Sequence, residues 1–488
     1  MQLDPSVCYR VMRARDARFD GRFFVAVRTT GIYCRPVCPA PLPRRQNCMF
    51  VSCAAAAEQA GYRPCLRCRP EAAPGTPAWL GSSTTVARAL RLIDAGALDD
   101  VGVDSLAARL GVGDRHLRRL FARHLGASPH AVAATRRTHF ARQLIDETSL
   151  PMAEVAFAAG FASVRRFNDA MRSAYGRSPS ALRRGAKRGR VDAGRNLELR
   201  LAYRPPYAWD AVLGFLAARA IPGVECVADG SYRRSFRQDA AVGWLEVAPV
   251  RDCHQLRVRI RVDGPLRLID LARRLRALFD LGASSDAIAA PLRGDPVLAR
   301  ALASLAGVRV PGAFDGFELA VRAILGQQVS VAAATRLAGR LVEQFGHELP
   351  HWCGSGDATA AIPTREFPSP ETLSHADVAR IGVPGVRAGA IRALARRVTE
   401  AGLQLEPGAD PQAVREALLS LPGIGDWTAA YIAMRALGEP DAFPAGDLGL
   451  CRALGVGAPE LARRAETWRP WRAYAAMLLW QHAASCGR

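Results

Sequence analysis

The sequence predicts a multidomain protein that is mainly α-helical and contains one α+β subdomain. Three observations lead to this fold class. The chain has 488 residues, more than a single hydrophobic core usually holds together. Apolar residues recur at helical spacing through residues 83–185 and again from about Phe314 to the end, whereas the alternation typical of strands is confined to the region between them. We therefore expect four segments: 1–75, 83–185, 195–305 and 306–488.

The composition points to a nucleic-acid partner. With 66 Lys and Arg against 45 Asp and Glu, the chain carries a net charge of +21 and a pI near 10.4. Most of the basic side chains are arginine, whose planar guanidinium suits phosphate oxygens. No apolar run approaches transmembrane length, and Met1–Pro5 lacks the basic and apolar regions of a secretion signal. We therefore expect a monomeric bacterial protein of the cytoplasm that associates with the nucleoid and not with a membrane.

Segment 1–75 contains two short-spaced cysteine pairs, Cys34-x3-Cys38 and Cys65-x2-Cys68. Each pair can span one edge of a tetrahedron, so the four thiolates fit a single Zn²⁺ ion. Disulfides are the alternative, and a reducing cytoplasm disfavours them. Cys48 and Cys53 could compete as ligands, but their spacing fits less well. The first linker, Ala72–Pro77, ends this segment.

Segment 83–185 repeats a helical pattern after about 50 residues. Each copy has a small residue, a glycine turn, a helix with exposed arginines and a final Gly-x-Ser-Pro, which is typical of a helix-turn-helix motif. We expect recognition helices near Asp114–His124 and Ser163–Tyr175. Their candidate DNA contacts are Arg115, Arg118, Arg165 and Arg166. A helical bundle with solvated arginines is the alternative, and the duplication argues against it.

A basic, glycine-rich linker, Gly185–Gly194, precedes segment 195–305. Apolar residues alternate with polar ones from Leu197 to Tyr203 and from Leu256 to Val262, which predicts half-buried antiparallel strands. Between them, Trp209–Arg219 is expected to be a helix. After Phe314 the helical period is interrupted once, by an insertion at His347–Pro370 that we expect to be unstructured.

Segment 306–488 contains the sequence Leu421-Pro-Gly-Ile-Gly-Asp-Trp427 between two expected helices. Asp410-Pro411 supplies a cap and an N1 proline for the first helix, and the second runs from Trp427 to Leu437. Glycines allow the backbone to approach a surface, and amides at the next helix N-terminus can bind phosphate. This pattern predicts a helix-hairpin-helix with Leu421, Gly423 and Gly425 at the DNA. A Pro-Gly turn also occurs between helices that never contact DNA.

Asp447 lies twenty residues after Trp427. A lone aspartate after a turn is usually a helix N-cap, and Leu448–Leu454 would be the helix that it caps. Enzymes that excise bases need one carboxylate near the sugar C1′, where positive charge develops as the glycosidic bond breaks. Asp447 is therefore the candidate catalytic carboxylate.

Residues 195–488 resemble AlkA-type DNA-3-methyladenine glycosylases. The matching stretches are Tyr203–Trp209, Leu213–Arg219, Val321–Gln327, Val329–Val331, the hairpin and Trp468–Tyr474. The resemblance implies that Asp447 is catalytic, that Trp427, Tyr431 and Trp480 line the pocket for the flipped base, and that Gln328 takes the place of the apolar wedge. Trp427 stands where lyase-competent relatives carry an amine, so a monofunctional glycosylase is implied. A monovalent cation at the hairpin is a further candidate ligand.

Residues 83–185 resemble the DNA-binding domain of AraC-type transcription regulators, which implies promoter DNA and RNA polymerase as partners. Phe23–Cys38 and Gly61–Cys68 resemble the N-terminal domain of Ada-type methyl phosphotriester repair proteins. That resemblance implies that the four cysteines hold Zn²⁺ and that Cys34 accepts a methyl group from the damaged DNA backbone. A purely structural zinc site is the alternative for Cys34.

Together these patterns predict a sensor, a promoter-binding module and a base-excision enzyme on one chain. The alternative is a transcription regulator with a structural zinc site, whose C-terminal half binds DNA without catalysis. No Pro-Cys-His-Arg sequence occurs, so direct reversal of damage at guanine O6 is not expected.

Overall fold

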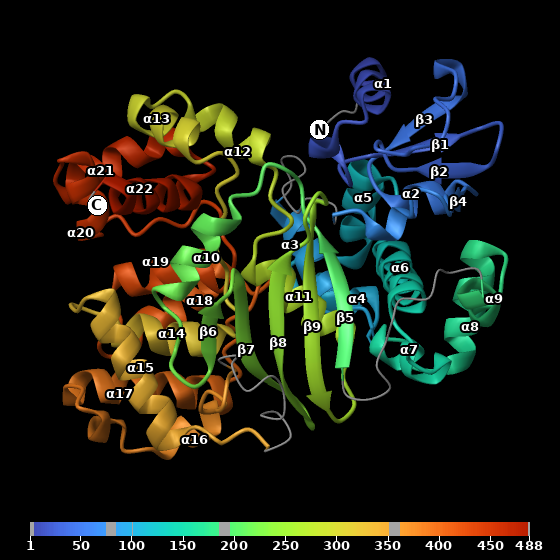
Figure 1. Cartoon of the computed structure of the whole chain (residues 1–488). Helices are drawn as coiled ribbons and strands as arrows, with labels where there is room; N and C mark the ends of the chain where they lie inside the picture. The colour runs from blue at the N-terminus through green and yellow to red at the C-terminus, as the bar shows by residue number, and fades with distance from the viewer. Residues whose placement is uncertain (1–3, 75–83, 100, 185–195, 351–361, 487–488) are drawn as a thin grey trace.

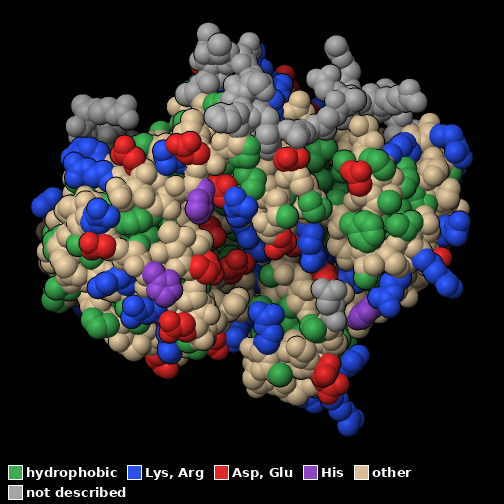
Figure 2. All heavy atoms as spheres, turned by 90° about the horizontal axis from the view of Figure 1, so that it is seen from below, with side chains coloured by type: hydrophobic (Ala, Val, Ile, Leu, Met, Phe, Trp, Pro, Cys, Tyr) green, Lys and Arg blue, Asp and Glu red, His purple; other side chains and the backbone are tan. Residues whose placement is uncertain are grey.

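The computed structural model describes residues 4–74, 84–99, 101–184, 196–350 and 362–486. A small sheet with two helices, a set of helices, a larger sheet and a second set of helices follow one another along the chain (Figure 1). This arrangement confirms the predicted fold class. Within the described ranges, no helix combines the length and the apolar character needed to cross a membrane. The face seen in Figure 2 intersperses Lys and Arg with Asp and Glu, so its positive charge is not gathered into one patch.

The N-terminal segment is built on a four-stranded sheet in the order β3-β1-β2-β4. Strand β2 ends at Cys34 and β4 directly precedes Cys65. The two strands run parallel, with Tyr33 opposite Pro64, so the sheet itself brings the two cysteine pairs together. The elements are α1 (Pro5–Ala14), β1 (Phe24–Val27), β2 (Ile32–Cys34), β3 (Cys48–Val51), α2 (Ala54–Gln59) and β4 (Arg63–Pro64).

The described residues of the next segment form seven helices, and the two helices predicted to be recognition helices are present as α5 and α8. Each ends at a glycine in the left-handed conformation, Gly126 (φ 69°) and Gly176 (φ 66°), as the repeated Gly-x-Ser-Pro pattern predicts. The long helix α6 connects the two motifs. The helices are α3 (Thr84–Asp94), α4 (Val103–Arg109), α5 (Asp114–Leu125), α6 (Pro129–Glu147), α7 (Met152–Ala158), α8 (Val164–Tyr175) and α9 (Pro179–Arg184). The linker Gly185–Gly194 lies outside the described residues.

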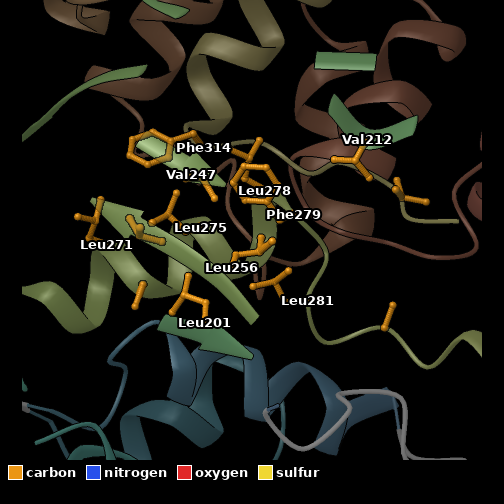
Figure 3. Packing of buried hydrophobic residues seen from close by; sticks show 14 of the residues in the cluster. Leu201, Val212, Val247, Leu256, Leu271, Leu275, Leu278, Phe279, Leu281 and Phe314 are labelled. Atoms are coloured by element: carbon orange, nitrogen blue, oxygen red, sulfur yellow. The ribbon is translucent and has the colours of Figure 1, made fainter. Parts of the chain in front are cut away.

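The α+β subdomain contains a five-stranded antiparallel sheet in the order β5-β9-β8-β7-β6. The two predicted strands pair directly, with Leu199 opposite Val258. Helix α11 packs against the sheet: its Leu271 and Leu275 belong to the same buried cluster as Leu256 of β9 (Figure 3). The elements are β5 (Asn196–Ala202), α10 (Trp209–Ala217), β6 (Glu225–Ala228), β7 (Ser231–Gln238), β8 (Ala241–Pro249), β9 (Gln255–Asp263) and α11 (Leu268–Leu278).

The α-helices of the remaining described residues follow from residue 285 onward. They are α12 (Ser285–Leu292), α13 (Pro296–Ser304), α14 (Gly316–Leu325), α15 (Val331–Phe345), α16 (Pro370–His375), α17 (Gly385–Thr399), α18 (Pro411–Leu419), α19 (Asp426–Arg435), α20 (Leu448–Leu454), α21 (Ala458–Ala465) and α22 (Arg472–Cys486). Asp410 caps α18 as predicted, because its carboxylate accepts from the amides of Gln412 (3.0 Å) and Ala413 (3.3 Å).

The insertion at 347–370 was expected to be unstructured, but both of its described ends are held by hydrogen bonds. Its middle, residues 351–361, lies outside the described residues. The amide of Leu349 donates to the carbonyl of Thr364 (2.8 Å), and the amide of Thr364 donates to Gly223 (2.7 Å). Glu366 accepts from Arg237 at 2.6 Å. These bonds pin the ends of the insertion to the α+β subdomain, a long-range contact that local sequence does not reveal.

The predicted segments share hydrophobic cores. Cys53 and Ala56 of the N-terminal segment pack in one cluster with the first helix-turn-helix. Phe167 of the second helix-turn-helix belongs to the same cluster as Leu199 and Leu201 of the large sheet. The four segments therefore pack against one another rather than standing apart on their linkers.

A fully buried arginine joins the N-terminal segment to the α+β subdomain. Arg204 donates through Nε to the carbonyl of Asp20 (2.8 Å), through Nη2 to Pro74 (3.1 Å) and through Nη1 to Gly282 (2.7 Å). Burial lowers the pKa of its guanidinium to about 9. A buried guanidinium is tolerable because these carbonyls replace its water partners.

Helix α3 makes a second junction, with the helices on either side of the hairpin. Arg88 Nη1 lies 2.9 Å from Asp410 Oδ2 at the start of α18, and Arg91 Nη1 lies 2.7 Å from Glu439 Oε1 after α19. Beside this junction a cavity of about 390 Å³ is lined by residues from all four segments, including Asp94 and Arg136.

We expect Arg204→Met to lower the free energy of unfolding by about 3 kcal/mol, because the substitution leaves buried carbonyls without a donor. Urea unfolding measures this difference. Arg200→Met is the matched control: Arg200 is exposed on β5, and its loss should change stability by less than about 0.5 kcal/mol. Equal effects of the two substitutions would contradict the role of Arg204.

Candidate functional site

The four predicted cysteines converge in the structure. One sulfur from each of Cys34, Cys38, Cys65 and Cys68 lies within 4.8 Å of the others, and among the described residues this is the one cluster of His, Cys, Asp or Glu that could hold a metal ion. A tetrahedral zinc–thiolate site has bonds of about 2.3 Å and therefore edges of about 3.8 Å. The quartet fits Zn²⁺ with small adjustments. Cys65 and Cys68 are buried, whereas Cys34 and Cys38 are partly exposed.

Two neighbours hold the Cys34 end of the cluster in place. Tyr33 is fully buried, and its hydroxyl donates to Glu58 Oε1 (2.8 Å) and lies 2.9 Å from His139 Nε2 of helix α6. Arg35 donates its amide to Cys68 Sγ (3.3 Å) and its guanidinium to the Cys68 carbonyl (3.1 Å). The residues on both sides of Cys34 are thus held in place, while Cys34 itself is partly exposed.

The competing cysteines stay outside the cluster. Cys53 packs in the core, with its sulfur 3.4 Å from the carbonyl of Leu125, and burial raises the pKa of its thiol to about 11. Cys48 lies on strand β3, and its sulfur contacts the carbonyl of Arg44 at 3.4 Å.

All four predicted arginines of the recognition helices are exposed: Arg115, Arg118, Arg165 and Arg166. On the opposite faces of the same helices, Leu117 of α5 and Phe167 of α8 are fully buried. Each helix therefore presents guanidinium groups to solvent from a rigid base, as contact with DNA phosphates and base edges requires.

The hairpin turn has the expected geometry. Gly423 has φ +85°, which disfavours a side chain, and Gly425 is the N-cap of α19. Both glycines are exposed and Leu421 is partly exposed. Gln327, which the sequence did not single out, donates to the Gly423 carbonyl (2.8 Å) and to Thr428 Oγ1 (3.0 Å).

Gln328 projects from the loop between α14 and α15. It is exposed and has φ +56°, a strained backbone conformation for a residue with a side chain. Val329 and Val331 beside it are 38% and 42% exposed. The hydrogen bond from Gln327 to the Gly423 carbonyl ties this exposed loop to the hairpin, so Gln328 and the hairpin turn lie on neighbouring loops. The sequence analysis singled out only the second glutamine of Gly326-Gln-Gln. The structure shows that the first one, Gln327, holds the loop against the hairpin.

Asp447 is both an N-cap and the centre of an aromatic cluster. Its Oδ1 accepts from the amide of Leu450 (2.8 Å), which is the capping bond, and from Trp480 Nε1 (2.9 Å). Its Oδ2 accepts from Trp427 Nε1 (3.0 Å). Three donors from α19, α20 and α22 therefore orient one carboxylate.

Tyr431 completes the cluster. Its ring stacks on Trp427 with centroids 5.2 Å apart and planes 8° apart, and its centroid lies 6.3 Å from that of Trp480. The structure thus brings all three predicted pocket residues around Asp447. Parallel and tilted rings beside a fixed carboxylate suit an electron-poor planar ligand whose bond to a sugar is to be broken. None of these residues lines the 390 Å³ cavity.

Models of known families match most of the chain. The metal binding domain of Ada matches residues 7–71, and a helix-turn-helix domain matches residues 106–185. The AlkA N-terminal domain matches residues 198–315, and the HhH-GPD superfamily base excision DNA repair protein matches residues 321–456.

Known relatives cover the whole chain or its parts. A Mycobacterium tuberculosis protein named probable bifunctional transcriptional activator/DNA repair enzyme AlkA is 45% identical over 482 residues, which is 97% of this chain and 95% of the relative. Escherichia coli DNA-3-methyladenine glycosylase 2 is 35% identical over 57% of this chain and 95% of its own length. The bifunctional transcriptional activator/DNA repair enzyme Ada of Escherichia coli is 42% identical over 24% of this chain and 32% of its own length.

Among solved structures, the 3-methyladenine DNA glycosylase of Archaeoglobus fulgidus is similar in fold. It superposes with a TM-score of 0.51 and 22% identity, and the match covers 58% of this chain and 98% of the glycosylase. At this identity the likeness shows a shared fold for the matched 58% of this chain.

We expect Cys65→Ala to abolish zinc binding, because it removes one of four converging ligands. Metal analysis of the purified variants measures zinc per chain. Cys53→Ala is the matched control and should keep the wild-type stoichiometry, since Cys53 contacts Leu125 and not the cluster. Loss of zinc in both variants would contradict the assignment.

Proposed function

Because the chain belongs to the family of bifunctional transcriptional activators and DNA repair enzymes of the AlkA type, we propose that it excises alkylated bases from DNA and senses methyl phosphotriesters. Residues 306–488 carry the glycosylase site and residues 195–305 support it. Residues 1–75 carry the sensor, and residues 83–185 bind promoter DNA. The observation that carries the enzymatic proposal is the position of Asp447 among Trp427, Tyr431 and Trp480.

In the glycosylase step, Trp427, Tyr431 and Trp480 hold a flipped base of the 3-methyladenine type, and Gln328 fills the space that it leaves in the duplex. The bond between C1′ and the base nitrogen breaks, and its electrons neutralise the positive charge of the alkylated base. The Asp447 carboxylate stabilises the cationic sugar and orients a water molecule, which adds to C1′ and loses a proton to solvent. Leu421, Gly423 and Gly425 bind the DNA backbone beside it.

In the proposed sensor, Cys34, Cys38, Cys65 and Cys68 would hold one Zn²⁺, and the ion would keep the sulfurs deprotonated. The Cys34 sulfur attacks the methyl carbon of a phosphotriester. A C–S bond forms, the C–O bond breaks, and the phosphate regains its negative charge. Neutral thioether replaces thiolate, so repulsion between this surface and DNA falls and affinity rises. Because Cys65 and Cys68 are buried, the methyl group is transferred to the partly exposed side of the cluster, where Cys34 lies.

Further proposals concern partners. Arg115, Arg118, Arg165 and Arg166 contact promoter DNA, and the methylated protein recruits RNA polymerase as a monomer. We also propose that the protein is cytoplasmic and that it associates with the nucleoid, which the net charge of +21 supports. The hairpin carbonyls also offer a site for a monovalent cation.

We expect Asp447→Asn to slow release of 3-methyladenine from alkylated DNA by about a hundredfold, because the amide cannot stabilise the cationic sugar. Chromatography of released bases under single-turnover conditions measures the rate. Asp252→Asn, in the exposed turn after β8, is the control and should match wild type. If the wild-type protein releases no base, the chain is a regulator with a non-catalytic C-terminal half.

Incubation with DNA that carries methyl phosphotriesters should add one methyl group per chain, located on Cys34. Intact-mass and peptide mass spectrometry measure it. Cys48→Ser should be methylated like wild type, whereas Cys34→Ser should gain nothing. An unmodified wild-type Cys34 would reduce the cluster to a structural zinc site.

A further inference from the structure

The cavity of about 390 Å³ beside helix α3 belongs to neither candidate site. Neither the cysteine quartet nor the aromatic cluster around Asp447 lines it. Its volume lies in the range of about 300–1,000 Å³ that is typical of pockets for small molecules. All four segments contribute to its wall, for example with Phe24, Thr135, Ala272 and Met434.

Three arginines on this wall carry donor groups without a partner. Arg276 of α11 makes no hydrogen bond and no ion pair with a described residue. The buried Nη1 of Arg136 on α6 and the buried Nε of Arg273 on α11 have no acceptor among the described residues either. Donors withdrawn from water normally have an acceptor, because leaving one unsatisfied is costly. A ligand with acceptor oxygens would satisfy these groups.

The carboxyl groups on the wall already have partners. Asp94 Oδ1 lies 3.3 Å from Nε of Arg136, and Glu439 Oε1 lies 2.7 Å from Nη1 of Arg91. Asp94 also attracts Arg276, but from beyond ion-pair distance. Two further contacts join Glu71 to Arg69 (3.3 Å) and Asp280 to the hydroxyl of Tyr474 (2.8 Å). No carboxylate of the wall is therefore left to neutralise Arg276.

Arg435 also lines the cavity, and its donors are satisfied. Its Nη1 donates to the Tyr431 hydroxyl at 2.6 Å, and its other nitrogens donate to the carbonyls of Pro311 and Gly312. The unsatisfied donors of the wall therefore come from helices α6 and α11.

The three unsatisfied arginines are neighbours. Burial lowers the pKa of Arg136 and of Arg276, and repulsion adds to this effect: Arg273 acts on Arg136, and Arg136 acts on Arg276. The carboxylates within ion-pair distance of these three groups are Asp94 and, 3.1 Å from Arg273, Glu406. Three guanidinium groups thus face two carboxylates, and the positive charge in excess attracts an anion.

We propose that this cavity binds a small organic phosphate. The phosphate group accepts from Arg276, Arg136 and Arg273 and supplies the missing negative charge. Guanidinium suits this contact because its planar fork can donate to two phosphate oxygens at once. The apolar body of the ligand packs on Leu90 and Ile269, which line the same cavity. This site goes beyond the proposed glycosylase and sensor functions and does not depend on them.

The side chain of Asp94 supports the presence of usable space. It is 63% exposed although it lines the cavity, so water or a ligand has room beside it. Because all four segments form the wall, the ligand binds only when they are packed together, and binding therefore stabilises the packed chain.

The first experiment uses phenyl phosphate as the probe and isothermal titration calorimetry of the full chain. We expect one site with a Kd below about 1 mM, and Arg276→Met should weaken binding by about tenfold. Arg274→Met is the matched control: Arg274 lies on the same helix but not on the cavity wall, so the affinity should equal that of wild type. No binding by wild type, or equal binding by Arg276→Met, would overturn the proposal. Inorganic phosphate that binds as tightly as phenyl phosphate would contradict the role of the apolar wall.

The second experiment measures thermal unfolding. Without a ligand, Arg276→Met should unfold at or above the temperature of wild type, because it removes a charge that has no partner. Phenyl phosphate should raise the unfolding temperature of wild type and of Arg274→Met but not that of Arg276→Met. A clear loss of stability in unliganded Arg276→Met would show that the charge of Arg276 is already compensated, and would overturn the proposal.

Discussion

One carboxylate holds the C-terminal site together. Asp447 caps α20 and accepts from the indoles of Trp427 on α19 and Trp480 on α22, so three helices meet at its two oxygens. Helix α19 begins directly after the hairpin turn, and Gln327 ties that turn to the loop that carries Gln328. The positions of the hairpin, the Gln328 loop, the three aromatic rings and the Asp447 carboxylate therefore follow from one connected arrangement of hydrogen bonds, as the proposed placement of a reacting sugar demands.

Buried guanidinium groups are the second recurrent feature, and they connect the segments. Arg204 joins the subdomain before the hairpin helices to Asp20 and Pro74 of the zinc-binding segment, and Arg435 joins α19 to Pro311 and Gly312. Guanidinium suits this role because its five donors can satisfy several carbonyls at once. The cysteine-cluster segment, the helix-turn-helix segment and the segments with the glycosylase fold thus share hydrophobic cores that cross the segment boundaries.

Local patterns predicted most of the elements that carry the candidate sites. The cysteine spacing, the repeated helix-turn-helix, the alternation around Leu256 and the position of Asp447 each depend on neighbours in sequence, and the described structure contains them. What the sequence could not predict depends on contacts between distant residues: the anchor at Arg204, the pairing of the insertion with Gly223 and the donors around Tyr431. Asp447 illustrates both cases. The sequence predicted that Asp447 could cap the following helix, but it did not predict the hydrogen bonds from the indoles of Trp427 and Trp480.

The most direct test measures methyl transfer and base release in the same reaction mixture. Wild-type protein is incubated with methylated DNA, and methyl groups per chain and bases released per chain are measured together. We predict that methylation stops at one group, on Cys34, while base release continues through many turnovers. Base release that stops at one per chain, or methylation without any base release, would contradict a fused sensor and glycosylase.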